Sequence, residues 1–273
     1  MLQQLRRHYC FARRAAFAAS SAILLLGLGG CQTAGTSDIT GSLGEKPEAS
    51  RAADPRRDLE GSRDRFRANP KDIDAALQYG RALRATGQKS QAVAVLEQAT
   101  LAHPSNKALL AGYGRALADN GNFQRAFDIL TRAHTPDDPD WRILSAQGAV
   151  LDQLGRYEEA RQYYASALKI APEEPSVLSN LGLSYVLAKN LPRAEEIMRR
   201  ANSRPDADRR VRLNLALVVG LQGRLADAET IVKADRPAEE AAADVADLKR
   251  LLARKGARAD AGKLPVAAAG RRD

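Results

Sequence analysis

Residues 77–99 read LQYGRALRATGQKSQAVAVLEQA, and residues 111–133 read AGYGRALADNGNFQRAFDILTRA, the same pattern 34 residues later. A small residue returns at this spacing through five successive units, at Gly80, Gly114, Gly148, Gly182 and Ala216. An alanine follows each of them after twelve residues, giving the column Ala92, Ala126, Ala160, Ala194 and Ala228. Five units in one register, without an insertion, indicate internal repeats over residues 73–236.

Each unit has the pattern of two antiparallel helices joined by a short turn. Apolar residues return at helical spacing on both sides of a turn signal, which in the first unit is Gly87-Gln88. Two helices that cross closely need a residue with little side chain at the crossing, and we expect Gly80 and Ala92 to supply it. Two columns of larger apolar residues should fill the space between units: Leu83, Leu117, Leu151, Tyr185 and Val219, and Leu96, Leu130, Tyr164, Met198 and Val232.

A period of 34 residues with two helices per unit is the spacing of tetratricopeptide repeats, and the chain resembles that family over about 165 residues. The resemblance implies an all-α fold, a solenoid of about five helix-turn-helix units with flanking capping helices. A single unit cannot bury its apolar face alone, so stacked neighbours would form one continuous core.

The first 30 residues are typical of a secretory signal. They contain four arginines and no acidic residue, and an apolar run extends from Ala15 to Gly30. A basic start followed by a short apolar run indicates a signal peptide, because the run is too short to span a bilayer comfortably. Removing residues 1–30 would lower the formal net charge from +9 to +5, so the rest of the chain is only moderately basic.

The segment Leu28-Gly29-Gly30-Cys31 resembles the bacterial lipobox. The resemblance implies that Cys31 is lipidated and becomes the first residue of the mature protein. Because Gln32 rather than aspartate follows, it also implies a lipid-anchored protein at the periplasmic face of the outer membrane. The alternative is a plain signal peptide, or an uncleaved anchor, with an incidental cysteine. The only other cysteine, Cys10, would leave with the signal peptide, so the mature chain could form no disulfide.

Four flanking segments complete the predicted organisation. Residues 31–54 are rich in small and polar residues and are expected to form a flexible, lipidated tether. Residues 55–70 are expected to form an N-terminal capping helix, or alternatively a degenerate half-unit. Residues 237–256 should form a C-terminal capping helix that ends at a glycine, and residues 257–273 a disordered tail.

No catalytic or metal-binding pattern is recognisable in the sequence. His103 and His134 are not at the spacing of metal ligands, and no phosphate-binding glycine loop, CxxC motif or nucleophile elbow occurs. The acidic pairs Glu158-Glu159 and Glu195-Glu196 are interpreted as solvated helix faces, and residues 137–140 as a turn that caps the helix beginning near Trp141. We therefore predict no enzymatic activity, no metal and no cofactor.

The candidate function is protein binding. In the tetratricopeptide family the first helix of each unit lines the concave surface. The glycine register predicts which residues lie on this wall. They are three arginines from the first two units, and asparagines and leucines from the fourth and fifth units. These residues are Arg81, Arg84, Arg115, Asn180, Leu183, Leu187, Asn214, Leu217 and Leu221. The asparagines can bond a peptide backbone and the leucines can accept apolar side chains of a partner. Alternatively, the leucines pack against the C-terminal capping helix. The expected partners are proteins and not nucleic acid.

The chain resembles the TadD family of lipoproteins from tight-adherence (Flp) pilus systems. The resemblance rests on the lipobox, the short polar linker, the five repeats and the closing stretch AAADVADL at residues 241–248. The resemblance implies a pilotin-like role, in which the chain assists assembly or localisation of the outer-membrane pilus secretin. Other repeat lipoproteins, including pilotins of type IV pili, share the first features. One alternative is a general cell-envelope scaffold for outer-membrane protein insertion or peptidoglycan machinery. Another is a cytoplasmic or inner-membrane interaction module whose signal is misread.

Overall fold

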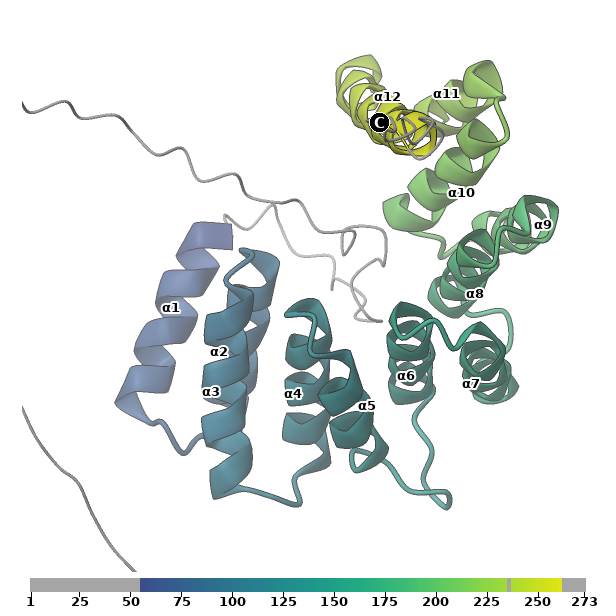
Figure 1. Ribbon diagram of the computed structural model, residues 1–273. Coiled ribbons are helices and arrows are strands. Elements are labelled where there is room, and N and C mark those ends of the chain that lie inside the picture. Colours follow the sequence, from purple (N-terminus) through teal and green to yellow (C-terminus); the bar gives the residue numbers. More distant parts are fainter. Residues whose placement is uncertain (1–54, 235–236, 262–273) are drawn as a thin grey trace, which may run out of the picture. The chain divides into compact units, whose positions relative to one another are not determined.

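The computed structural model describes residues 55–234 and 237–261, where the regular secondary structure is helical (Figure 1). The predicted signal peptide, lipidated Cys31 and tether lie outside the described residues, as does the end of the predicted tail. Within the described ranges, no helix combines the length and the apolar character that a membrane span requires.

Five helix pairs follow one another in the order that the repeats predict, so the all-α repeat fold is confirmed. The pairs are α2 (Ile73–Ala85) with α3 (Lys89–Ala102), α4 (Lys107–Asp119) with α5 (Phe123–Thr131), α6 (Trp141–Gln153) with α7 (Tyr157–Ile170), α8 (Pro175–Leu187) with α9 (Leu191–Asn202), and α10 (Arg209–Leu221) with α11 (Leu225–Lys233). Helix α1 (Pro55–Ala68) precedes these pairs, and α12 (Ala238–Ala261) follows them.

The turn inside each unit uses a residue with positive φ. In four units it is glycine, which adopts this conformation without steric cost: Gly87, Gly121, Gly155 and Gly223, with φ between 76° and 84°. In the fourth unit it is Lys189, with φ of 61°. The predicted turn signals therefore lie at the helix breaks, and one unit forms the same turn without glycine.

The first helices of four units begin with an Asp or Asn whose side chain accepts backbone N–H bonds, namely Asp72, Asn106, Asp140 and Asp208. Asp140, expected to cap the helix that starts at Trp141, accepts from the backbone N of Arg142 at 2.7 Å. Such caps satisfy N–H groups that have no partner inside the helix. Helix α8 instead begins with Pro175, which needs no N–H partner.

The small residues lie where the two helices of a unit cross. A Cβ atom added at Gly80 would lie 2.7 Å from the Leu96 side chain, and one added at Gly148 would lie 2.7 Å from Tyr164. Added Cβ atoms at Gly114 and Gly182 would collide with the second helices of their units in the same way. The alanine column is fully buried. A larger residue would therefore force the helices apart, as the sequence pattern predicted.

Each second helix packs against the first helix of its own unit, and those of the first four units also pack against the first helix of the next unit. In the two columns of larger residues nine members are buried, whereas Tyr185 is half-buried. The stacked units thus share their apolar faces, and no unit has to bury its core alone.

Flanking helices cover both ends of the repeats. Helix α1 packs on α2, where the Phe66 ring centroid lies 5.6 Å from that of Tyr79. Helix α12 packs on α10 and α11 and buries Val245 and Leu248. Helix α12 continues past Gly256, where the sequence pattern suggested an end. A glycine inside a helix costs only about 1 kcal/mol, and the neighbouring residues favour the helix.

Candidate protein-binding face

The first helices α2, α4, α6, α8 and α10 each contact the next first helix along the chain. Their side chains that are not buried therefore form one continuous surface, which we call the first-helix face. This surface corresponds to the wall on which the sequence placed its candidate binding residues.

Side-chain hydrogen bonds connect neighbouring first helices along this face. Asn180 Nδ2 donates to Ser145 Oγ at 3.1 Å, and Asn214 Nδ2 donates to Ser179 Oγ at 2.9 Å. Arg84 Nε donates to Asp119 Oδ2 at 2.6 Å. In all three bonds the partners are 35 residues apart, one repeat plus one residue. The amide nitrogens of both asparagines thus hold adjacent units together, and their amide oxygens remain able to accept a bond from a partner.

The three candidate arginines differ in exposure. Arg81 is exposed, Arg84 is half-buried, and Arg115 is buried with 7% of its surface accessible. All three interact with other groups of the protein. The glycine register predicts the helix face on which an arginine lies, but it does not predict how deeply the next unit covers it.

The four candidate leucines also divide by burial. Leu183 and Leu217 are only 3% and 4% accessible, and they share a buried cluster with residues of α12. Leu221 is half-buried and packs against the same cluster. For these three the structure favours packing within the fold over an open binding site. Leu187 is also half-buried, but it lines a cavity.

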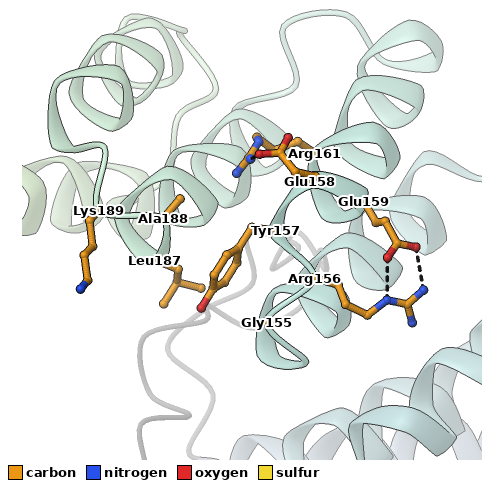
Figure 2. A pocket seen from close by; sticks show the side chains of 9 residues that line it. All are labelled: Gly155, Arg156, Tyr157, Glu158, Glu159, Arg161, Leu187, Ala188 and Lys189. Atoms are coloured by element: carbon orange, nitrogen blue, oxygen red, sulfur yellow. Dashed lines mark hydrogen bonds and ion pairs between the residues drawn. The ribbon is translucent and has the colours of Figure 1, made fainter.

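This cavity, the inter-turn pocket, lies between the turn of the third unit and the end of α8, and its volume is about 480 Å³ (Figure 2). Its lining comes from two segments one repeat apart in register: Gly155, Arg156, Tyr157, Glu158, Glu159 and Arg161 from the third unit, and Leu187, Ala188 and Lys189 from the fourth. Of these lining residues, the sequence pattern predicted only Leu187 as a candidate binding residue. The one available signal was a lysine at the turn position that other units fill with glycine.

Two arginines of the pocket are paired with carboxylates of α7. Arg156 donates through Nε and Nη2 to the two carboxylate oxygens of Glu159, at 2.8 and 2.6 Å (Figure 2). These bonds lower the pKa of Glu159. Arg161 is paired with Glu158. The acidic pair of α7 is therefore exposed, as predicted, and each member has an arginine partner.

A buried carboxylate connects three helices of the third and fourth units. Asp152 of α6 accepts from Tyr164 Oη of α7 at 2.9 Å and from Ser184 Oγ of α8 at 2.7 Å. Burial raises the pKa of Asp152 to about 6, although both hydrogen bonds and the charge of Arg161 act in the opposite direction. The sequence pattern indicated Tyr164 only as a member of an apolar column, so this cluster was not predicted.

Glu195 corrects the interpretation of the second acidic pair as a simple solvated face. Its side chain is 15% accessible and accepts from Arg199 Nη2 at 2.7 Å and from Gln222 Nε2 at 2.8 Å. It is also paired with Arg224. The Arg224 bond is the largest of the effects that lower the pKa of Glu195 to about 2. Glu195 therefore connects α9 to the turn between α10 and α11.

Both histidines of the described segments have protein partners. His103 Nε2 lies 3.0 Å from the carbonyl oxygen of Lys71, and His134 Nε2 lies 3.0 Å from Gln147 Oε1. Among the residues that the structure places, no group of three His, Cys, Asp or Glu side chains is arranged to hold a metal ion.

Family models described as tetratricopeptide repeat match residues 77–140, 124–175, 153–217 and 209–233. Together the matches extend from residue 77 to residue 233. No curated protein sequence matches the chain significantly.

Solved structures with this fold include a thermophilic TPR protein from Thermus thermophilus, with 22% identity and a TM-score of 0.57, covering 66% of this chain and 97% of that one. PilW, described as a widely conserved type IV pilus biogenesis factor, has 19% identity and a TM-score of 0.57, covering 73% and 91%. In the Cut9–Hcn1 hetero-tetramer of the APC/C, a chain with 16% identity and a TM-score of 0.54 is matched over 66% of this chain but over only 36% of its own length. At identities this low, the structural matches show a shared fold alone.

Proposed function

Because the chain belongs to the tetratricopeptide-repeat family, we propose that it is a non-enzymatic adaptor that binds protein partners at the periplasmic face of a bacterial outer membrane. In this role it assists assembly or localisation of the secretin of a tight-adherence (Flp) pilus. Membership of the repeat family supports protein binding. The role in pilus assembly and the location at the outer membrane are part of the proposal.

The observation that carries the adaptor role is the continuous first-helix face. Successive first helices contact one another, and hydrogen bonds between their side chains hold neighbouring units in register. An extended partner segment can therefore lie across several units without ordering the surface first. A binding surface that is already ordered loses less entropy when a partner binds.

The lipobox-like segment Leu28-Gly29-Gly30-Cys31 supports the location. A basic, apolar N-terminal segment that ends in this motif is suited to export and to lipid attachment at Cys31. A lipid on Cys31 would hold the repeats close to the membrane in which a secretin assembles.

Two observations support the pilus setting. The chain shares its fold with PilW, a pilus biogenesis factor. Its order of lipobox, polar linker, five repeats and closing helix also resembles the repeat lipoproteins of tight-adherence systems.

The proposal is tested in the native host by deleting the gene and measuring secretin multimers in outer-membrane fractions. We expect the multimers to fall several-fold and to return when the full chain is restored. A chain carrying Cys31→Ser should restore them poorly. Unchanged secretin amount and location would contradict the proposal. Detergent sensitivity under conditions in which no pili are made would instead support a general envelope scaffold.

A further inference from the structure

The inter-turn pocket lies where the fourth unit departs from the repeat pattern. Four units place glycine at the left-handed turn position, whereas the fourth places Lys189 there, with φ of 61°. This conformation is sterically unfavourable for a residue with a Cβ atom. Backbone strain of this kind is concentrated at functional sites, where the surrounding structure holds it in place. Two non-glycine residues of the described segments have positive φ, Glu173 and Lys189, and the second of them lines the pocket.

The charges around the pocket leave one cation available. Arg156 is paired with Glu159, and Arg161 with Glu158, each within α7 or at its N-terminus. Lys189 forms no ion pair or side-chain hydrogen bond with any residue that the structure describes. Its ammonium group therefore gives the pocket an unneutralised positive charge at the edge formed by the fourth unit.

Apolar side chains line the same pocket as Lys189. Tyr157 and Leu187 are both half-buried, and Figure 2 shows the Tyr157 ring directed toward Leu187. A volume of about 480 Å³ is within the range of cavities that hold small ligands, and it can accept side chains of a partner. The lining of the pocket thus includes an aromatic ring, an aliphatic side chain and a lysine.

We propose that the inter-turn pocket binds an acidic and apolar segment of a protein partner. A carboxylate of the segment pairs with Lys189, and a neighbouring aromatic or branched aliphatic side chain packs on Tyr157 and Leu187. This inference rests on the proposed adaptor role and specifies the partner chemistry. The single cation outside these ion pairs, Lys189, suits one carboxylate rather than a continuous polyanion such as nucleic acid.

The test measures fluorescence anisotropy of two labelled, C-terminally amidated peptides with the full chain. The acidic probe is Gly-Asp-Phe-Asp-Leu-Gly, and the matched neutral probe is Gly-Asn-Phe-Asn-Leu-Gly. We expect the native chain to bind the acidic probe about threefold more tightly, the scale of one exposed ion pair. Lys189→Gln should remove this preference. Lys169→Gln, which removes an exposed lysine outside the pocket, should retain it.

A second variant controls for folding. Lys189→Gly also removes the ammonium group, but it places glycine in the left-handed position, so its melting temperature should be equal to or higher than that of the native chain. It should lose the acidic preference as well. Equal binding of the two probes to the native chain, or a preference that survives in both Lys189 variants, would overturn the proposal.

These results are separable from those of the secretin experiment. If the probes show no preference while secretin multimers still depend on the chain, the pocket assignment fails and the pilus role stands. If the preference is present and depends on Lys189 while secretin is unaffected, the pocket assignment stands and the pilus role fails.

Discussion

The junction between the second and third units and the junction between the third and fourth units place different chemistry at equivalent positions. Three buried positions, displaced by one 34-residue repeat, carry apolar side chains at the first junction and polar side chains at the second. The apolar set is Ala118, Leu130 and Val150, and the polar set is Asp152, Tyr164 and Ser184. Repetition of the backbone therefore does not require repetition of the core.

A gain in folding stability does not explain why the junction between the third and fourth units is polar. A buried carboxylate loses its hydration, and its two hydrogen bonds offset that cost only in part, as the raised pKa of Asp152 indicates. The apolar set at the neighbouring junction shows that the fold does not need these groups. The same junction carries Lys189 and the inter-turn pocket. Departures from the repeat thus gather at one place, which is where we locate partner recognition.

The largest expected effect comes from overpacking the helix crossings at the two junctions. Gly114→Leu should lower the free energy of unfolding by about 3 kcal/mol, because even a Cβ atom at this site would collide with Leu130. Gly148→Leu should cost about 1–2 kcal/mol more, because it displaces Tyr164 and removes a hydrogen bond from buried Asp152. Urea denaturation of both variants measures the difference. Equal losses, or losses below about 1 kcal/mol, would show that the helix register is misassigned or that Tyr164 moves freely.

A smaller effect should appear in the pH dependence of the free energy of unfolding, through Asp152 at the polar junction. The pKa of Asp152 is raised from 3.8 to about 6, so the folded state keeps a proton that the unfolded chain releases between these values. Stability from this group is fully present below about pH 4 and is lost as the pH rises through about 6, on the order of 2 kcal/mol. Asp152→Asn should flatten this decline.

The control for this measurement is the choice of pH range. Glu195, with its pKa lowered to about 2, contributes stability that is lost as the pH falls below about 4.5, which is the opposite direction. Urea denaturation at about pH 5 and at about pH 7.5 therefore avoids the Glu195 effect, and comparison with Asp152→Asn assigns the decline to Asp152. A native chain that is equally stable at both pH values, or an Asp152→Asn variant with the same decline, would contradict the account.

Features of the fold that depend on local backbone requirements were predictable from the sequence. Gly80 had to be small because the crossing helix leaves no space for a Cβ atom, and Asp140 had to cap α6 because its N-terminal N–H groups need an acceptor. Gly256 does not end α12 as the sequence pattern suggested, because a glycine inside a helix costs only about 1 kcal/mol and the neighbouring residues favour the helix.

The candidate site was less predictable, because burial depends on contacts between units. Leu183 and Leu187 lie one helical turn apart in the same register, yet Leu183 is buried and Leu187 lines a pocket. The hydrogen bond between Asp152 and Ser184 joins residues 32 positions apart and exists only because α6 contacts α8. A sequence pattern places such residues on a helix face, but it does not show which neighbour covers them.

The most direct test of partner binding at the inter-turn pocket is site-specific photo-crosslinking in the native host. A photoreactive amino acid replaces Leu187 in the pocket or, as the matched control, Leu101 of α3, which is 78% exposed and lies outside the first-helix face. The account predicts that position 187 captures a secretin or another pilus component, identified by mass spectrometry, and that position 101 does not. Capture of the same partner from position 101 alone, or equally from both positions, would contradict it.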